Sequence, residues 1–181
     1  MTADTQYWGK HRGTVVNNVD PEMRGRLQVM VPDVLGPSIS SWAEPCVPLA
    51  GPTGPPMGVY MVPPMGTGVW VEFEGGDLDH PIWAGCRWGS QADIPPLSHA
   101  GLPTSPNIVL QTLTQHSLTL SDLPGPTGGI LLKTATGAMI SVSDVGITIT
   151  NGKGATINMT GTSISITGTP VIINNGALTV T

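Results

Sequence analysis

Short apolar units recur at a nearly constant interval through the last forty or so residues, and this repeat constrains the fold more than any other feature. Each unit holds two apolar residues separated by one other residue, and successive units start 7, 10, 7, 7 and 7 residues apart. The units are Ile140 and Val142, Ile147 and Ile149, Ile157 and Met159, Ile164 and Ile166, Val171 and Ile173, and Leu178 and Val180. Alternation with a period of two, interrupted by Gly and Asn, predicts very short β-strands with one apolar face.

The length of the unit limits what the repeat can enclose. One rung of a single-chain solenoid must surround a closed core, which takes roughly 18 or more residues. A seven-residue unit that contributes two apolar side chains and then turns back covers only one face of a prism. Because closed rotational symmetry is usual in homo-oligomers, we expect a homotrimer in which residues 108–181 form an intertwined β-helix or β-prism, with the twelve apolar residues above in its core. The alternative is one sheet of a β-sandwich or of a binding module.

The composition divides the chain into two parts. All aromatic residues lie before residue 90, and the residues before 99 carry the whole net charge of -5. Charged residues make up 10% of the chain, against about 25% in an ordinary soluble domain, and the neutral second part suits a rigid shaft. We predict a barrel over 1–94, an extended and stiff Pro-rich linker over 95–107, and a needle over 108–181. Nine or so strand levels at about 4.8 Å each would give a shaft on the order of 40 Å long.

The first part contains strand signals and no convincing helix. Apolar alternation predicts five strands, over 13–16, 26–31, 43–48, 68–73 and 81–86. Five strands in about ninety residues indicate a small all-β Greek-key barrel, of which the OB-fold is the commonest version. A Pro-rich loop between the third and fourth strands carries Met57, Tyr60 and Met61. Flexible thioethers adapt to binding surfaces, so this loop either contacts a partner or folds back onto its own barrel.

The polar residues do not form a catalytic or metal-binding pattern, so we predict neither an enzyme nor a cofactor. The segments Asp77-Leu78-Asp79-His80 and Asp20-Pro21-Glu22 indicate turns, and Arg24 and Arg26 are expected at the surface. Five basic residues stand against ten acidic ones before residue 99, which disfavours nucleic acid as a partner. We interpret Trp70 and Trp83 as barrel-packing residues.

The sequence contains no membrane span and no signal peptide pattern in its first residues. We therefore expect synthesis in the cytoplasm without a signal peptide. Cys46 and Cys86 are too few for a disulfide framework, and we expect reduced, buried thiols.

One ordered series of short motifs carries a resemblance to a known family. The series is Gly13-Thr14-Val15, Asp20-Pro21, Gly25-Arg26-Leu27-Gln28-Val29, Val31-Pro32, Trp42-Ala43, Gly51, Pro64-Met65-Gly66, Val69-Trp70-Val71-Glu72-Phe73-Glu74-Gly75-Gly76-Asp77 and Pro81-Ile82-Trp83-Ala84-Gly85. Over residues 9 to about 88 it resembles the OB-fold of phage baseplate spike proteins, a family that includes the gpV type and the Vgr proteins of type VI secretion. In that family a trimeric β-helical needle follows the barrel.

The resemblance implies a homotrimeric spike in a virion or phage-tail-like particle. Such a spike attaches to a baseplate hub protein, for which Met57, Tyr60 and Met61 are candidate contacts. It makes transient contact with the target membrane and pierces the envelope when the sheath contracts. An OB-fold binding module for nucleic acid or carbohydrate, without a spike role, is the alternative.

Two features of some relatives are missing from the sequence. No lysozyme domain fits between the barrel and the needle, and none of the four histidines forms the metal-binding His-x-His motif of the tip. Open strand edges at the end of a needle need a cover. We therefore expect a separate tip protein of the PAAR type, contacting Val171, Asn174, Asn175, Leu178 and Thr181.

Overall fold

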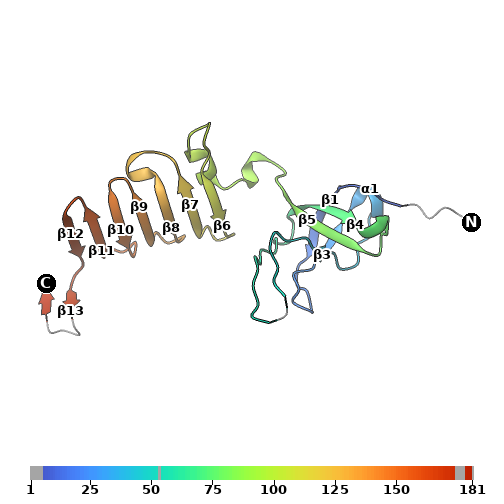
Figure 1. Cartoon of the computed structure of the whole chain (residues 1–181), viewed down its shortest axis with the longest axis horizontal. Coiled ribbons are helices and arrows are strands. Elements are labelled where there is room, and N and C mark those ends of the chain that lie inside the picture. The colour runs from blue at the N-terminus through green and yellow to red at the C-terminus, as the bar shows by residue number, and fades with distance from the viewer. Residues whose placement is uncertain (1–5, 53, 174–177, 181) are drawn as a thin grey trace, which may run out of the picture. The chain divides into compact units, whose positions relative to one another are not determined.

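The computed structural model describes residues 6–52, 54–173 and 178–180, and the chain is nearly all β, as predicted (Figure 1). It forms two compact units, Met1–Gln91 and Ala92–Thr181. Each unit folds on its own strands, and the two are described separately below.

The first unit is a small barrel. Its strands are β1 (His11–Asn17), β2 (Gln28–Met30), β3 (Glu44–Pro45), β4 (Gly68–Phe73) and β5 (Pro81–Arg87). They lie in the order β2-β1-β4-β5-β3, with β3 and β5 parallel. An antiparallel bridge between Leu27 and Ala43 links the two ends of this sheet and closes the barrel. Two short helical segments, α1 (Pro32–Leu35) and the 3-10 turn η1 (Glu74–Gly76), are the parts that the strand pattern did not predict.

The barrel core follows from the alternation of its strands. Its buried apolar residues are Val15, Leu27, Val29, Val31, Ala43, Val69, Val71, Phe73 and Trp83. Trp83 confirms its predicted packing role, and its indole Nε1 donates to the carbonyl of Gly25 at 3.0 Å. The interpretation of Trp70 as a core residue is wrong, because it lies between the inward-facing Val69 and Val71 and is only half-buried. The two cysteines are free but exposed, so the expectation of buried thiols is also wrong.

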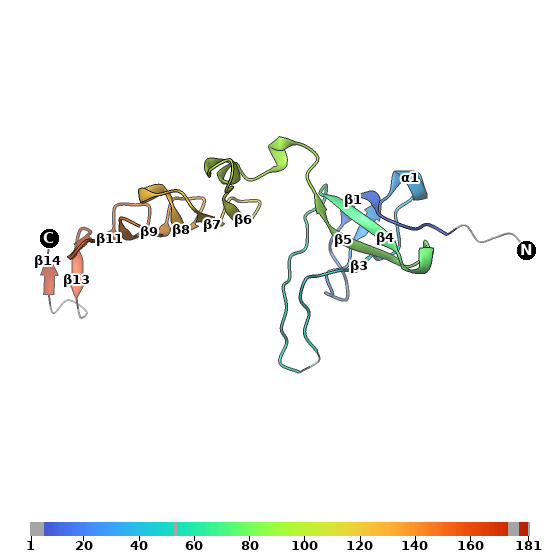
Figure 2. The same ribbon diagram turned by 45° about the horizontal axis from the view of Figure 1, so that its top comes forward.

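A long arm, residues 46–67, joins β3 to β4 and protrudes from the barrel (Figure 2). Its two sides pair through the bridge between Ala50 and Gly58, with backbone hydrogen bonds from Gly51 to Met57 and from Val59 to Leu49. No charged residue occurs between Glu44 and Glu72.

The Pro-rich stretch that precedes the second sheet is less extended than predicted. It contains the 3-10 segment η3 (Pro96–Ala100), and a second 3-10 segment, η2 (Gln91–Asp93), precedes it. The side-chain amide of Asn107 donates to the carbonyl of Leu97 at 2.8 Å and ties the start of the sheet to η3. The prolines begin η3 because a fixed φ near -65° suits the first turn of a helix.

The second unit is built on one antiparallel meander. Its strands are β6 (Ile108–Gln111), β7 (Ser117–Ser121), β8 (Gly129–Lys133), β9 (Met139–Ser143), β10 (Gly146–Thr150), β11 (Thr156–Thr160) and β12 (Ser163–Thr167), with the 3-10 turn η4 (Gly125–Thr127) before β8. These seven strands lie in sequence order, so each pairs with its neighbours along the chain. Both edges of β7 to β11 are therefore occupied within one chain, and the winding of three chains around one axis stays a prediction.

The connections alternate between the two margins of this sheet. At the loop margin lie three five-residue loops, 112–116, 134–138 and 151–155. In each loop the first residue accepts a hydrogen bond through its side-chain oxygen from the backbone N–H four residues later: His116 to Thr112, Ala138 to Thr134, and Ala155 to Asn151. At the turn margin lie the connection 122–128 and the two-residue turns 144–145 and 161–162.

The last strands, β13 (Val171–Ile173) and β14 (Leu178–Val180), pair with each other as a separate two-stranded sheet. Seven strands at about 4.8 Å per step give the main sheet a height of roughly 30 Å. This is shorter than the expected shaft, because the repeat spacing continues past β12 while the pairing of the main sheet does not.

Candidate functional site

Two continuous rows of apolar side chains cross one face of the β6–β12 sheet, and together they form what we call the apolar face. Directly paired residues in neighbouring strands point to the same side of a sheet, so the register defines each row. The first row is Ile108, Leu120, Ile130, Val142, Ile147, Met159 and Ile164. The second row is Leu110, Leu118, Leu132, Ile140, Ile149, Ile157 and Ile166.

The apolar face is uncovered in the single chain. Its side chains are half-buried or exposed, and exposure is largest at the two ends, where Ile108 is 65% and Ile164 is 69% accessible. A contiguous apolar surface of this extent marks an interaction site. The central row of the opposite face runs Val109, Thr119, Leu131, Ser141, Thr148, Asn158 and Ser165 and is mainly polar.

The first eight apolar residues of the repeat, from Ile140 to Ile166, all lie on this face. Their role as a trimer core stays a prediction, but the register brings them together on one side. Sequence reasoning missed the six that precede them: Ile108, Leu110, Leu118, Leu120, Ile130 and Leu132. These show the same apolar-x-apolar pattern. The sequence prediction missed them because connections of five to seven residues separate their strands, so that successive units start more than seven residues apart.

The remaining repeat residues lie in the terminal hairpin. Val171 pairs with Val180 and Ile173 with Leu178 in the register of the β13–β14 pair. Of the predicted tip contacts, Val171 begins β13 and Leu178 begins β14, whereas Asn174, Asn175 and Thr181 lie outside the described residues.

The predicted hub contacts lie on the arm with their side chains accessible. Met57 and Met61 are each 59% exposed and Tyr60 is 72% exposed. Both ends of the arm contact the barrel: the Asn18 side-chain amide donates to the carbonyl of Pro63 at 3.1 Å, and the backbone N–H of Cys46 donates to the carbonyl of Trp83 at 3.0 Å. The exposed side chains leave the tip of the arm accessible, and the hub contact stays a prediction.

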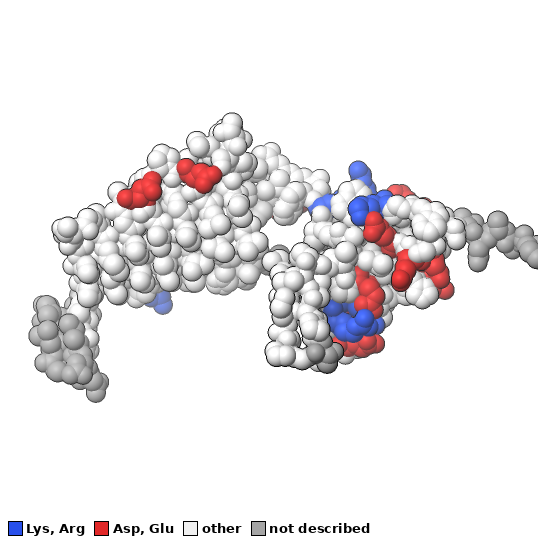
Figure 3. All heavy atoms as spheres, in the orientation of Figure 1, with Lys and Arg blue, Asp and Glu red and all other residues white. Residues whose placement is uncertain are grey.

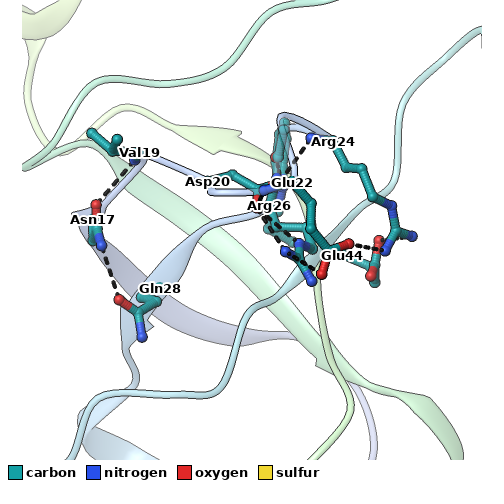
Figure 4. Close-up of polar contacts among 10 residues, drawn as sticks. Asn17, Val19, Asp20, Glu22, Arg24, Arg26, Gln28 and Glu44 are labelled. Atoms are coloured by element: carbon teal, nitrogen blue, oxygen red, sulfur yellow. Dashed lines mark hydrogen bonds and ion pairs between the residues drawn. The ribbon is translucent and has the colours of Figure 1, made fainter.

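The arm rests on the β1–β2 loop, which Asp20 holds in place (Figure 4). The Asp20 carboxylate accepts backbone N–H bonds from Glu22, Arg24 and Arg26, and the Arg26 guanidinium donates to it at 2.7 Å. Gly25 follows with φ of 80°, and a Cβ there would lie 3.3 Å from both Tyr60 and Val62. The close approach of the arm therefore requires glycine at this position.

Arg26 corrects the expectation of a surface side chain. It is 9% exposed, pairs with Asp20 and lies 5.6 Å from the ring of Trp42. The hydrogen bond from this guanidinium, followed by the backbone donors, holds the pKa of Asp20 well below its usual range, and Asp20 in turn raises the pKa of Arg26. Both groups stay charged, and they pair with each other within one chain. Arg24 is exposed and pairs with Glu22 and Glu44.

The other acidic motifs form turns, as predicted. Met23 donates its backbone N–H to the carbonyl of Asp20, and His80 donates its backbone N–H to the carbonyl of Asp77. The pKa of Asp77 is lowered first by the backbone N–H of Asp79 and then by the His80 ring.

Among the described residues, no group of three or more His, Cys, Asp or Glu could hold a metal ion. Within the same part of the chain, no helix is long and apolar enough to cross a membrane.

Two family models match the chain over these two units. Residues 11–88 match the type VI secretion system/phage-baseplate injector OB domain, which agrees with the closed barrel. Residues 107–179 match the phage baseplate V C-terminal trimerisation domain. This second match covers the sheet with the apolar face and supports assembly as a homotrimer. No curated protein sequence matched the chain.

Proposed function

The chain belongs to the phage baseplate V family of spike proteins, and we propose that it is the central spike of a contractile tail or injection-system baseplate. Its role in the baseplate is structural. In this proposal the homotrimer attaches to the hub through its barrels and is driven through the target envelope when the sheath contracts. Penetration is mechanical and needs no catalytic residue.

The apolar face is the observation that carries the proposal. Strands β8 to β12 are each five residues long, which is about 17 Å. Three sheets of that width, arranged as a triangular prism, place the central axis about 5 Å from each sheet, half of the roughly 10 Å between packed sheets. Two apolar side chains per strand then fill the interior. Three copies thus bury the apolar face without leaving a central channel.

The same geometry suits a body that transmits axial force. The axis of the prism runs across the strands, so the hydrogen-bonded ladder of β6–β12 lies along the direction of load. Opening one strand also exposes apolar side chains of the other two chains, which raises the cost of local unfolding. Low charge on the shaft is compatible with passage through an envelope.

Attachment and capping involve two further surfaces. We assign the hub contact to the arm, where Met57, Tyr60 and Met61 are exposed and apolar. We assign the PAAR-type tip contact to the C-terminal end of the needle, where all five residues of β12 are exposed and β12 pairs only with β11 among the described strands. Its free edge and the β13–β14 hairpin offer backbone groups to a covering protein.

Removal of this chain from its particle tests the function. Particles without it are expected to contract normally but to fail to depolarise target cells, and addition of the unaltered chain during assembly restores depolarisation. The matched variants are Ile157→Asp, which should not restore it, and Asn158→Asp, which should. Particles that lack the chain and still depolarise target cells at the normal rate would refute a piercing role.

A further inference from the structure

We propose that the two margins of the β6–β12 sheet are an acidic surface and a basic surface that pair between neighbouring chains of the trimer. The inference rests on the proposed trimeric spike and adds which surfaces meet where neighbouring sheets join. Its occupant is a second copy of this chain.

The charges of the needle are separated by sign. Residues 108–181 contain only four charged side chains, Asp122, Lys133, Asp144 and Lys153. Asp122 follows the end of β7 and Asp144 follows the end of β9, so both lie at the turn margin. Lys133 ends β8 and Lys153 lies in the loop after β10, so both lie at the loop margin. Figure 3 shows acidic side chains along one margin of this unit and a basic one at the opposite margin.

These charges have no ionic partner among the described residues of their own chain. None of the four takes part in the ion pairs that join described residues of the barrel. Asp122 accepts a hydrogen bond from the neutral hydroxyl of Ser105. The width of a five-residue strand, about 17 Å, keeps each Asp away from each Lys of the same sheet.

A three-sided prism brings opposite margins together. A closed ring of three identical chains uses heterologous contacts, in which one surface meets a different surface of the next copy. At each edge of the prism, the turn margin of one sheet therefore meets the loop margin of its neighbour. Asp122 then faces Lys133, and Asp144 faces Lys153. In both pairs the Lys follows the Asp by one strand, an offset of about 4.8 Å, which the flexible four-carbon side chain of Lys can span.

The paired margins favour the closed ring over open arrangements of the same chain. The two apolar rows are repetitive, so a slip of two strands between neighbouring chains preserves most apolar contacts, but such a slip repeated around the axis does not close into a ring. After such a slip Lys133 of one chain meets Asp144 of the next, while Asp122 and Lys153 lose their partners. Rim ion pairs contribute modest affinity but exclude misaligned partners. The four charges thus disfavour slipped, open assemblies that the apolar face alone tolerates.

Zero-length carbodiimide cross-linking of the full chain tests this pairing. The reagent joins a carboxylate to a lysine amine only where the two are in contact. We mix chains of normal and heavy nitrogen, reassemble the trimer, and identify cross-linked peptides by mass spectrometry. The expected products are Asp144 to Lys153 and Asp122 to Lys133, each in mixed-isotope form. They are lost selectively in the variants Asp144→Asn and Lys133→Gln, respectively.

Charge reversal gives an independent readout. Asp144→Lys alone is expected to weaken the trimer about tenfold in dissociation constant, since three pairs are lost at once. The exchange Asp144→Lys with Lys153→Asp should restore the affinity of the trimer.

A trimer that gives neither cross-link, or that joins Asp122 to Lys153 instead, would overturn the margin pairing and leave the spike intact as a proposal. A chain that forms no trimer would instead refute the proposed function.

Discussion

Replacing Ile157 with Asp is expected to abolish the trimer. Ile157 lies in the second row of the apolar face, directly between Ile149 and Ile166 on the neighbouring strands. In the prism three copies of this side chain approach the axis, so three carboxylates would be buried together without a partner. Transfer of each charge from water costs several kcal/mol, and mutual repulsion adds to it. Sedimentation of the variant should show monomers.

The neighbouring residue provides the control. Asn158 is on the same strand but points to the polar face and is exposed. Asn158→Asp adds the same three charges to the outside of the prism and should leave the trimer intact. If Ile157→Asp remains trimeric, or if both variants dissociate alike, the apolar face is not the interior of the assembly.

Replacing Gly146 with Ala is expected to disrupt the pairing of β10 with β11. Gly146 has φ of 153°, and a Cβ there would lie 2.1 Å from the carbonyl oxygen of Met159. The Cβ and the carbonyl oxygen are both held rigidly by the backbone, so no side-chain rotation relieves the clash. The two strands must therefore separate. We expect a loss of more than about 3 kcal/mol, within the range of severe single substitutions, measured as thermal denaturation of the trimer.

Gly161 is the matched control for this substitution. It has φ of 57° in the turn between β11 and β12, and a Cβ there would meet nothing within 4 Å. Gly161→Ala should cost only the left-handed backbone penalty of about 1–2 kcal/mol. Equal losses in the two variants would show that backbone conformation, and not the contact with Met159, sets the effect at Gly146.

The sequence predicted the apolar pattern well because alternation maps directly onto the two sides of a strand. The seven-residue interval identified the strands from Ile140 onward. The earlier strands were expected only as levels of the 108–181 needle, and their apolar residues were not identified because loop length varies without changing which residues face inward. The outward position of Trp70 was accessible from the alternation of Val69 and Val71, but its place within a strand pattern was interpreted as a core or barrel-packing position.

Features that depend on chain folding over longer distances could not be predicted. Arg26 is buried because the turn after β1 directs the Asp20 carboxylate toward it. The local sequence, an arginine beside a glycine, does not predict this burial. The division of charges between the two margins likewise depends on strand direction. Asp144 and Lys153 are nine positions apart in the sequence, and only the meander puts them on opposite margins.

The most direct test of the account is sedimentation equilibrium of the unaltered full-length chain. A central spike whose apolar faces enclose a shared interior must be a stable trimer over a wide range of concentration. We predict a single species of three times the chain mass. A folded monomer, or a dimer with its two sheets face to face, would contradict the trimeric needle.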